Sequence, residues 1–106
     1  MQPLNEYRKL AARHNVIKYR FILAELDLAL TFCDVALASD DRMKSKRNAE
    51  NARRAYDSAT HFLVNTDFSD RMKAIVAKKV TMLKRMLRRV ERHRYAFAAS
   101  ETGGTV

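Results

Sequence analysis

The sequence predicts an all-α protein, an up-down-up three-helix bundle with a long first helix. The chain has only two Gly and one Pro among its 106 residues, so few positions interrupt a helix. Apolar residues recur every three or four positions over most of its length, which is the spacing of one helical face. Short polar segments at 39–41 and 65–69 separate three such stretches. Short connections favour antiparallel neighbours.

The chain is long enough for a single hydrophobic core. It is 47% hydrophobic, and a chain of this size forms one modest domain. We expect that domain to span residues 1–100. Residues 101–106 include the pair Gly103-Gly104 and are expected to form a flexible C-terminal tail.

The first helix is predicted to begin after a cap at Asn5 and to end before Ser39. It carries two apolar rows. The first row is Tyr7, Leu10, His14, Ile17, Phe21, Ala24, Leu28 and Val35. The second row is Leu23, Leu26, Leu30, Cys33 and Leu37. Because the C-terminal half is apolar on two sides, we expect it to be the central element, covered by two partner helices.

The second helix is predicted to follow the acceptors Ser39, Asp40 and Asp41 and to run to about Val64. Its inward face is rich in small residues, which let two helices approach closely. That face is Ala49, Ala52, Tyr56, Ala59 and Leu63, with Ala55 and Phe62 beside it. Arg53 and Asp57 are four residues apart and are expected to form an ion pair.

Two asparagines near the start of the second helix, Asn48 and Asn51, lie on one flank. Asn is a poor residue in a helix interior, so the pair are candidates for hydrogen bonds to a partner protein. The alternative is that they are solvent-facing polar residues near a frayed helix start.

The third helix is expected to begin after a cap at Asp67 or Ser69 and to place Val76, Leu83 and Leu87 in the core. At equal rise per residue, each first-helix residue is expected level with the third-helix residue roughly 55 positions later. This register places Asp34 beside Arg89. It also places Glu25 and Asp27 within one turn of Lys78, Lys79, Lys84 and Arg85.

The same register leaves residues 5–14 beyond the end of the three-helix core. An unpaired helical turn that carries Tyr7, Leu10 and Ala11 is an exposed apolar patch or a docking surface. We take these three residues as self-association candidates and expect homodimerisation through this end.

Positive charge gathers in the third helix. The formal net charge is +9, and the segment from Ser69 to Ala98 carries most of it, against only Asp70 and Glu91. Its outward arc is expected to hold Lys78, Lys84, Arg85, Arg88, Arg89 and Arg92. Such a stripe is a candidate for binding successive phosphates of a nucleic acid. Without a helix-turn-helix pattern or an aromatic ladder, the binding would be directed to the backbone.

No residue pattern predicts catalysis. The three histidines, His14, His61 and His93, fall on different helices and lack the spacing of a helical metal site. The single cysteine, Cys33, lies among apolar neighbours and is expected to be a small buried residue. There is no glycine-rich phosphate loop. We therefore expect no catalytic residue, metal, cofactor or small-molecule substrate.

The most apolar stretch, residues 21–38, is not expected to cross a membrane, because three carboxylates interrupt it. The start of the chain lacks the basic and apolar regions of a signal peptide. A cytoplasmic location without a membrane partner is expected.

Three resemblances add to these expectations. The spacing of Arg88 and His93, with four residues between them, is similar to the active-site motif of HEPN ribonuclease domains. That resemblance implies that Arg88 positions phosphate and His93 assists RNA cleavage. The segment 48–59 reads N-A-E-N-A-R-R-A-Y-D-S-A and follows L-A-L-T-F-C at 28–33 and Asp40-Asp41. Over residues 26–63 the chain thereby resembles a group of short bacterial helical proteins with an N-A-R-x-A-Y-D-x-A segment. Those proteins have no assigned activity, so this likeness implies only a helical fold.

The stretch around residues 26–63 is also loosely similar to one helix pair of a tetratricopeptide repeat, but no repeat period recurs in the chain. Taken together, the residues favour a non-enzymatic helical protein–protein interaction or assembly module, either a homo-oligomer or the binder of a protein partner. Nucleic-acid-backbone binding is the alternative, and a HEPN-like ribonuclease is a third.

Overall fold

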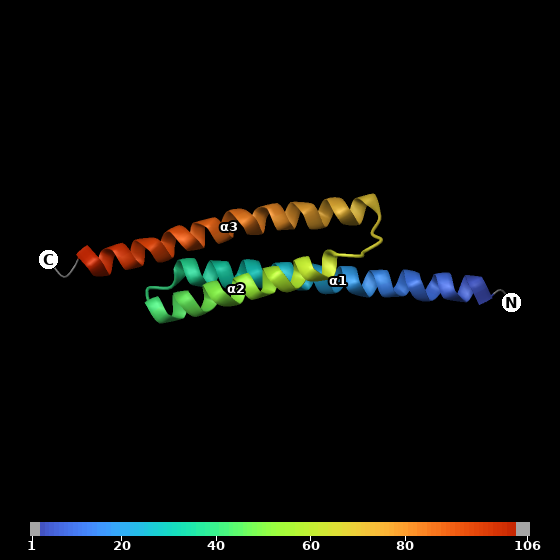
Figure 1. Ribbon diagram of the computed structural model, residues 1–106, viewed down its shortest axis with the longest axis horizontal. Helices are drawn as coiled ribbons and strands as arrows, with labels where there is room; N and C mark the ends of the chain where they lie inside the picture. Colours follow the sequence, from blue (N-terminus) through green and yellow to red (C-terminus); the bar gives the residue numbers. More distant parts are fainter. Residues whose placement is uncertain (1–2, 104–106) are drawn as a thin grey trace.

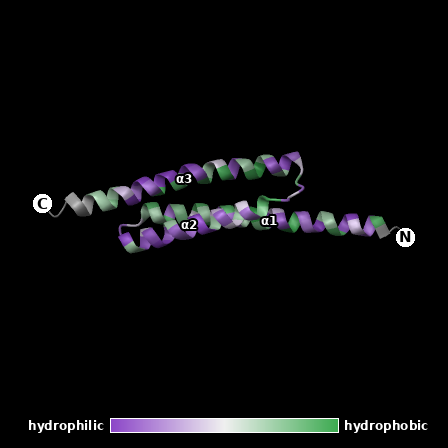
Figure 2. Ribbon diagram, in the orientation of Figure 1, coloured by the Kyte–Doolittle hydropathy of each residue, from purple (hydrophilic) through white to green (hydrophobic). Residues whose placement is uncertain are grey.

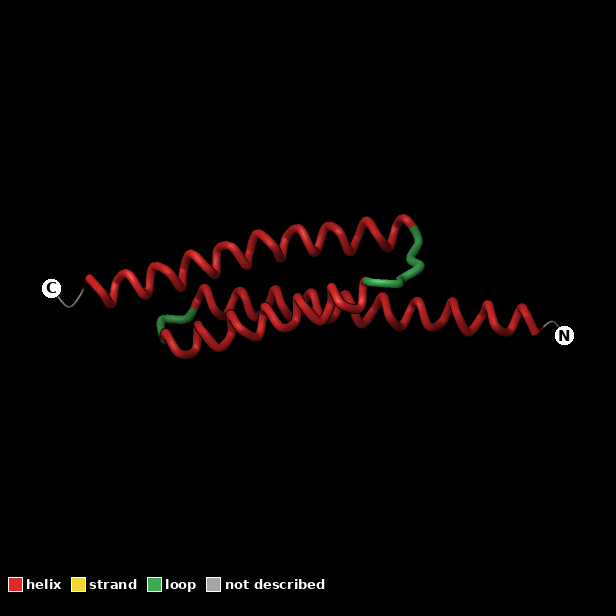
Figure 3. Tube along the Cα trace, in the orientation of Figure 1, coloured by secondary structure: helices red, strands yellow, loops and turns green. Residues whose placement is uncertain are grey.

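Three helices form the structure, a computed structural model that describes residues 3–103, with side chains described over 4–99. They are α1 (Pro3–Ala38), α2 (Arg42–Leu63) and α3 (Asp70–Gly103). α2 runs back along the C-terminal half of α1, and α3 then returns in the direction of α1 (Figure 1). Two short loops join the helices at opposite ends of the bundle (Figure 3). The predicted all-α, up-down-up three-helix bundle with a long first helix is confirmed.

The predicted ends of α2 and the predicted start of α3 are confirmed, whereas the predicted cap at Asn5 is wrong: α1 already begins at Pro3, a residue that suits the first position of a helix. The carboxylate of Asp41 caps α2 and accepts hydrogen bonds from the backbone N–H groups of Met43 (2.9 Å) and Lys44 (3.3 Å). The hydroxyl of Ser69 caps α3 and accepts from the N–H of Met72 (3.2 Å). After α2 the chain turns at Asn65, whose φ of 66° is left-handed, a conformation that Asn tolerates better than most residues.

α3 continues further than the sequence predicted. Its backbone is helical to Gly103, so residues 101–103 of the expected tail extend the helix. Residues 104–106 lie outside the described part of the chain.

α1 and α2 pack closely because both present small side chains at their contact. On α1 the buried residues are Ile22, Leu26, Ala29, Cys33 and Ala36. On α2 they are Ala49, Ala52, Ala55 and Ala59, together with Ser45. The hydroxyl of Ser45 donates to the carbonyl of Ala36 at 2.8 Å, so this buried polar group is satisfied. The alanine face predicted for α2 is therefore confirmed.

The prediction that partner helices cover both apolar sides of α1 is wrong. The row that begins at Tyr7 is largely open to solvent, and even its central members Phe21 and Leu28 remain 41% and 43% exposed. α2 and α3 both pack on the side of α1 that carries Ile22 and Leu26. They contact each other as well, so the three helices enclose one core and leave the other side of α1 uncovered. Figure 2 shows that the C-terminal half of α1 is markedly hydrophobic, whereas α2 is mostly hydrophilic.

The register between α1 and α3 differs from the expected one by about one turn. The side-chain amide of Asn15 donates to the carbonyl of Asp67 (3.1 Å), and Lys79 pairs with Asp27 (2.5 Å). Both contacts join residues 52 positions apart. The ring of Phe68 explains the shift, because it is buried and packs edge to face on Tyr19 with centroids 5.6 Å apart. This anchor sets where α3 begins.

The expected ion pairs change with the register. Asp34 lies level with Met86 rather than with Arg89, and within residues 4–99 neither Asp34 nor Glu25 forms an ion pair. Of the acids expected to face α3, Asp27 alone does so in this range. The local pair predicted within α2 is present, with Nε of Arg53 3.5 Å from Oδ1 of Asp57.

The bundle is elongated. Its extents are 78 × 21 × 18 Å and its radius of gyration is 18.8 Å, against about 13 Å for a compact domain of about 100 residues. The N-terminal half of α1 extends past the end of α2, and the C-terminal end of α3 extends past the opposite end of the bundle (Figure 1). As predicted, the segment 5–14 projects beyond the core, with Tyr7 71% and Leu10 64% exposed.

Candidate functional site

α1 carries a mostly apolar row that the other helices of the described chain leave largely exposed. We call it the outer row. It consists of Tyr7, Leu10, His14, Ile17, Phe21, Ala24, Leu28, Thr31 and Val35. Successive members are alternately three and four residues apart, which is the seven-residue repeat of a coiled-coil seam. At 1.5 Å per residue the row is about 42 Å long.

Exposure concentrates along this row. Seven large hydrophobic side chains of α1 are exposed, and all but Leu4 and Val16 belong to the outer row. Scattered exposed hydrophobics are normal on a protein surface, whereas a contiguous stripe marks an interaction site. Ile17, near its middle, is 66% exposed. The self-association candidates Tyr7 and Leu10 belong to this row, and the exposed Ala11 borders it.

The apolar surface continues onto α2. The rings of Phe21 and Phe62 meet edge to face, with centroids 4.9 Å apart, and Phe62 remains 40% exposed. Asn51 lies on the same side of α2 as Phe62, because eleven residues make about three helical turns. The partner-contact candidates Asn48 and Asn51 are both half-buried, and Asn48 donates to the carbonyl of Lys44 at 2.8 Å. Asn48 therefore already has a local partner.

A basic face covers the outward side of α3. All six nucleic-acid candidates are exposed: Lys78, Lys84, Arg85, Arg88, Arg89 and Arg92. None of them forms an ion pair with another described side chain. Arg89 contacts the sulfur of Met86 at 3.7 Å. Lys79, which points to α1, is the lysine that pairs with Asp27.

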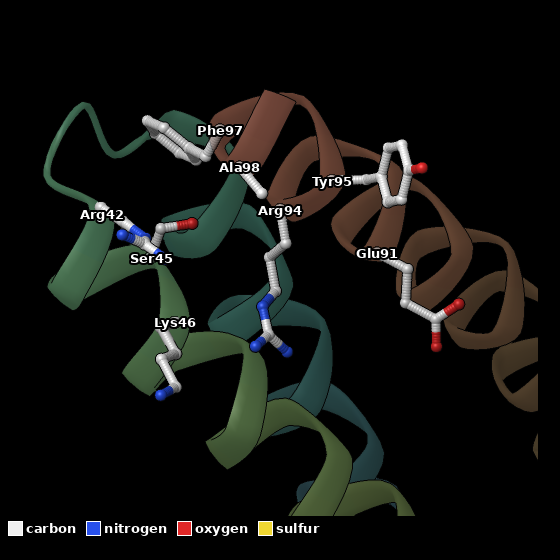
Figure 4. Close-up of a pocket in the computed structure, with 8 residues that line it drawn as sticks. All are labelled: Arg42, Ser45, Lys46, Glu91, Arg94, Tyr95, Phe97 and Ala98. Carbon is white, nitrogen blue, oxygen red and sulfur yellow. The ribbon is translucent and has the colours of Figure 1, made fainter. Parts of the chain in front are cut away.

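A cleft of about 340 Å³ opens where α3 separates from α2. The buried stripe of α3 ends at Val90, and one turn later the same face carries Arg94. Figure 4 shows Arg94 reaching from α3 toward α2. The lining residues are Arg42, Ser45, Lys46, Glu91, Arg94, Tyr95, Phe97 and Ala98. Cations outnumber carboxylates there, so the lining of the cleft carries a net positive charge, and the hydroxyl of Ser45 donates to the carbonyl of Ala36.

The structure does not bring Arg88 and His93 together. Five residues along a helix turn through roughly 140° beyond a full turn. Arg88 faces solvent, whereas Nε2 of His93 is buried without a hydrogen-bond partner and its ring packs on Phe97 with centroids 4.8 Å apart. An RNA-cleaving pair needs both side chains on one phosphate, and one chain does not provide that arrangement.

The described residues offer no clustered metal ligands, no reactive cysteine and no membrane-spanning helix. No group of three or more His, Cys, Asp or Glu side chains lies close enough to hold a metal ion within that part of the chain. Burial, and to a smaller degree the charge of Asp34, raises the pKa of Cys33 to about 11, and the thiol is fully buried, so it is not a reactive nucleophile. None of the described helices combines the length and apolar character needed to span a bilayer.

Sequence reasoning missed three features of these surfaces. It treated the row from Tyr7 as a core face, it did not single out Phe62 as its continuation, and it did not anticipate the cleft at Arg94. In the sequence, the apolar residues on the buried face of α3 give way to Arg94 after Val90. This change from an apolar to a charged residue could have indicated the cleft.

Comparison with known proteins gives no relative: no family model matches the chain, and no curated protein or solved structure matches it.

Proposed function

We propose that this protein is a non-enzymatic helical assembly module, and that the outer row of α1 is its interaction surface. The uncovered seven-residue repeat carries the proposal. The row is apolar and about 42 Å long, and the chain's own helices leave Tyr7, Leu10 and Ile17 more than 60% exposed.

The free energy available at this surface supports the proposal. Full burial of one large aliphatic or aromatic side chain is worth about 1.5 to 3 kcal/mol. Five large side chains of the outer row are between 41% and 71% exposed. Covering them releases about 5 kcal/mol or more per chain on this scale. That gain is large enough to oppose the entropy lost when another helix associates.

The test is the mass of the protein in solution. We expect the full chain to have a mass above that of one 12.3 kDa chain in sedimentation equilibrium at micromolar concentration. Leu10→Lys should reduce it to a single chain, because a lysine in a coiled-coil seam is strongly unfavourable. Val16→Lys is the matched control, since Val16 is exposed on α1 outside the outer row. A wild-type monomer, or equal loss in both variants, contradicts the proposal.

A second candidate function is binding of a nucleic-acid backbone by the basic face of α3. The six exposed cations without ion pairs favour it, as does the neighbouring Tyr95, which is 79% exposed and available to stack on a base. Reversing Arg85, Arg88, Arg89 and Arg92 to Glu together should abolish binding of labelled DNA or RNA at near-physiological salt and leave assembly intact. Equal affinity in the variant contradicts this role.

We further propose a cytoplasmic location, which the free thiol of Cys33 supports because unpaired cysteines are common in reducing compartments.

A further inference from the structure

The charges beside the outer row indicate what covers it. This inference rests on the proposed assembly function and names the occupant. In a coiled coil, the residues that flank the apolar seam on each side meet their counterparts on the neighbouring helix. Along one edge of the outer row these residues are Glu6, Arg13, Arg20, Asp27 and Asp34, each seven after the last. Along the other edge, Lys18 is followed seven residues later by Glu25.

The sign of the charge therefore reverses at the middle of the row. Apart from Glu6, beside the first member of the row, the N-terminal half is bordered by cations, and the C-terminal half is bordered by anions. Within the described side chains, Arg13, Lys18, Arg20, Glu25 and Asp34 form no ion pair. Asp27 uses Oδ1 to bind Lys79 and is 58% exposed, so its other oxygen remains open to a second cation. These charges are available to a partner.

We propose that the occupant is a second copy of this chain, with its α1 antiparallel to the first. The two-fold axis passes between Phe21 and Ala24. In this arrangement each outer row covers the other. Leu10 lies opposite Val35 of the second copy, Ile17 opposite Leu28, and Phe21 opposite Ala24.

The same arrangement matches each bordering cation with an anion, and it places Glu6 beyond the end of α1 of the second copy. Arg13 meets Asp34 of the second copy, Arg20 meets Asp27, and Lys18 meets Glu25. Symmetry repeats each pair on the other side of the axis. Complementary charges of this kind select the orientation of a coiled coil.

A parallel pairing fits poorly. It places flanking residues five positions apart beside each other, so Arg13 faces Lys18 of the second copy. Only Arg20 and Glu25 form an attractive pair in that case. A parallel pairing also stacks His14 on His14 and leaves the projecting segment 5–14 in contact only with itself.

The antiparallel pairing also accounts for the projecting end of α1. Residues 5–14 of one copy lie along the C-terminal half of the other α1, where Leu28 is exposed and Val35 half-buried, beside the flank of α2 that carries Asn51. α2 packs antiparallel to α1 in each copy (Figure 1). In the dimer, α2 and α1 of one copy are therefore followed by α1 and α2 of the other. Each of these four helices is antiparallel to the next, a common arrangement for helical bundles.

A charge swap tests the pairing. Arg13→Glu replaces two attractive contacts per dimer by two repulsive ones and should raise the Kd of the dimer about tenfold. The double variant Arg13→Glu with Asp34→Arg exchanges the two charges and should restore the wild-type Kd. Lys9→Glu is the matched control, because Lys9 is exposed on α1 away from both edges of the outer row and the net charge changes equally.

Disulfide trapping tests the orientation directly. In a Cys33→Ala background, chains with Leu10→Cys are mixed with tagged chains carrying Val35→Cys and then oxidised. Cross-links between the two kinds of chain are expected. A dimer that cross-links Leu10→Cys to itself, or whose Kd the charge swap does not restore, overturns the antiparallel pairing but leaves the assembly function standing. A chain that is monomeric throughout overturns both.

Discussion

Replacing Ile17 by Ala should weaken assembly with little effect on folding. Ile17 is 66% exposed in the single chain, so about a third of its side chain contributes to the stability of the monomer. Ala also has a higher helix propensity than Ile, which offsets part of that loss. In the antiparallel dimer, Ile17 is covered by Leu28 of the second copy. The substitution therefore removes apolar contact mainly from the interface.

The size of the effect follows from the exposed fraction. Full burial of an Ile side chain is worth about 1.5 to 3 kcal/mol, so burying the exposed two thirds is worth about 1 to 2 kcal/mol. Each dimer contains two such sites, which makes about 2 to 4 kcal/mol in total. Because 1.4 kcal/mol is a factor of ten in Kd, the Kd should rise about 100-fold.

Two measurements check this prediction. Sedimentation equilibrium over a concentration series gives the Kd of each variant. Urea unfolding below the Kd, where the chain is monomeric, gives its own stability, which should change by less than about 1 kcal/mol. Val16→Ala is the control, since Val16 is 37% exposed and lies outside the outer row. An unchanged Kd for Ile17→Ala, or an equal rise for Val16→Ala, refutes the reasoning.

Three further predictions concern the bundle itself. Asp41→Ala leaves the N–H groups of Met43 and Lys44 without their acceptor and should cost about 1 kcal/mol of unfolding free energy in urea denaturation; no change would mean that water replaces the cap fully. Ala52→Leu places a large side chain in the fully buried contact between α1 and α2 and should cost about 1 to 3 kcal/mol in the same assay, whereas Arg54→Leu on the exposed face should not. The thiol of Cys33 has a pKa of about 11 in the folded chain against 9.0 as its ordinary value, so the unfolded chain loses this proton first and stability should fall as the pH rises through that window. Cys33→Ala should remove that part of the pH dependence, and an identical pH profile in the variant would contradict the burial of the thiol.

The ends of α2, the start of α3 and the α2 face were predictable because their causes are local. A capping carboxylate such as Asp41 acts within three residues of itself, and alanines at helical spacing leave one obvious close contact. The choice between the two apolar sides of α1 was not local. Both sides have helical periodicity, and only the positions of α2 and α3 decide which one is buried. The spacing alone therefore misassigned the row that contains Phe21 and Leu28.

The register between α1 and α3 was off by about one turn for a related reason. Counting residues at constant rise assumes that the connection between α2 and α3 adds no displacement. In the structure Phe68 turns into the core and packs on Tyr19, and this contact between distant segments fixes the start of α3. The new register removes the expected pair of Asp34 with Arg89. It leaves Asp34 unpaired in the single chain and so available at the edge of the outer row.

The central claim is that the outer row of α1 is covered by another copy of the chain. Sedimentation equilibrium of the wild-type protein over a series of micromolar concentrations tests it most directly. The account predicts a mass that rises with concentration and levels off at twice the 12.3 kDa of one chain. A mass that stays at that of one chain up to the highest concentration would contradict it.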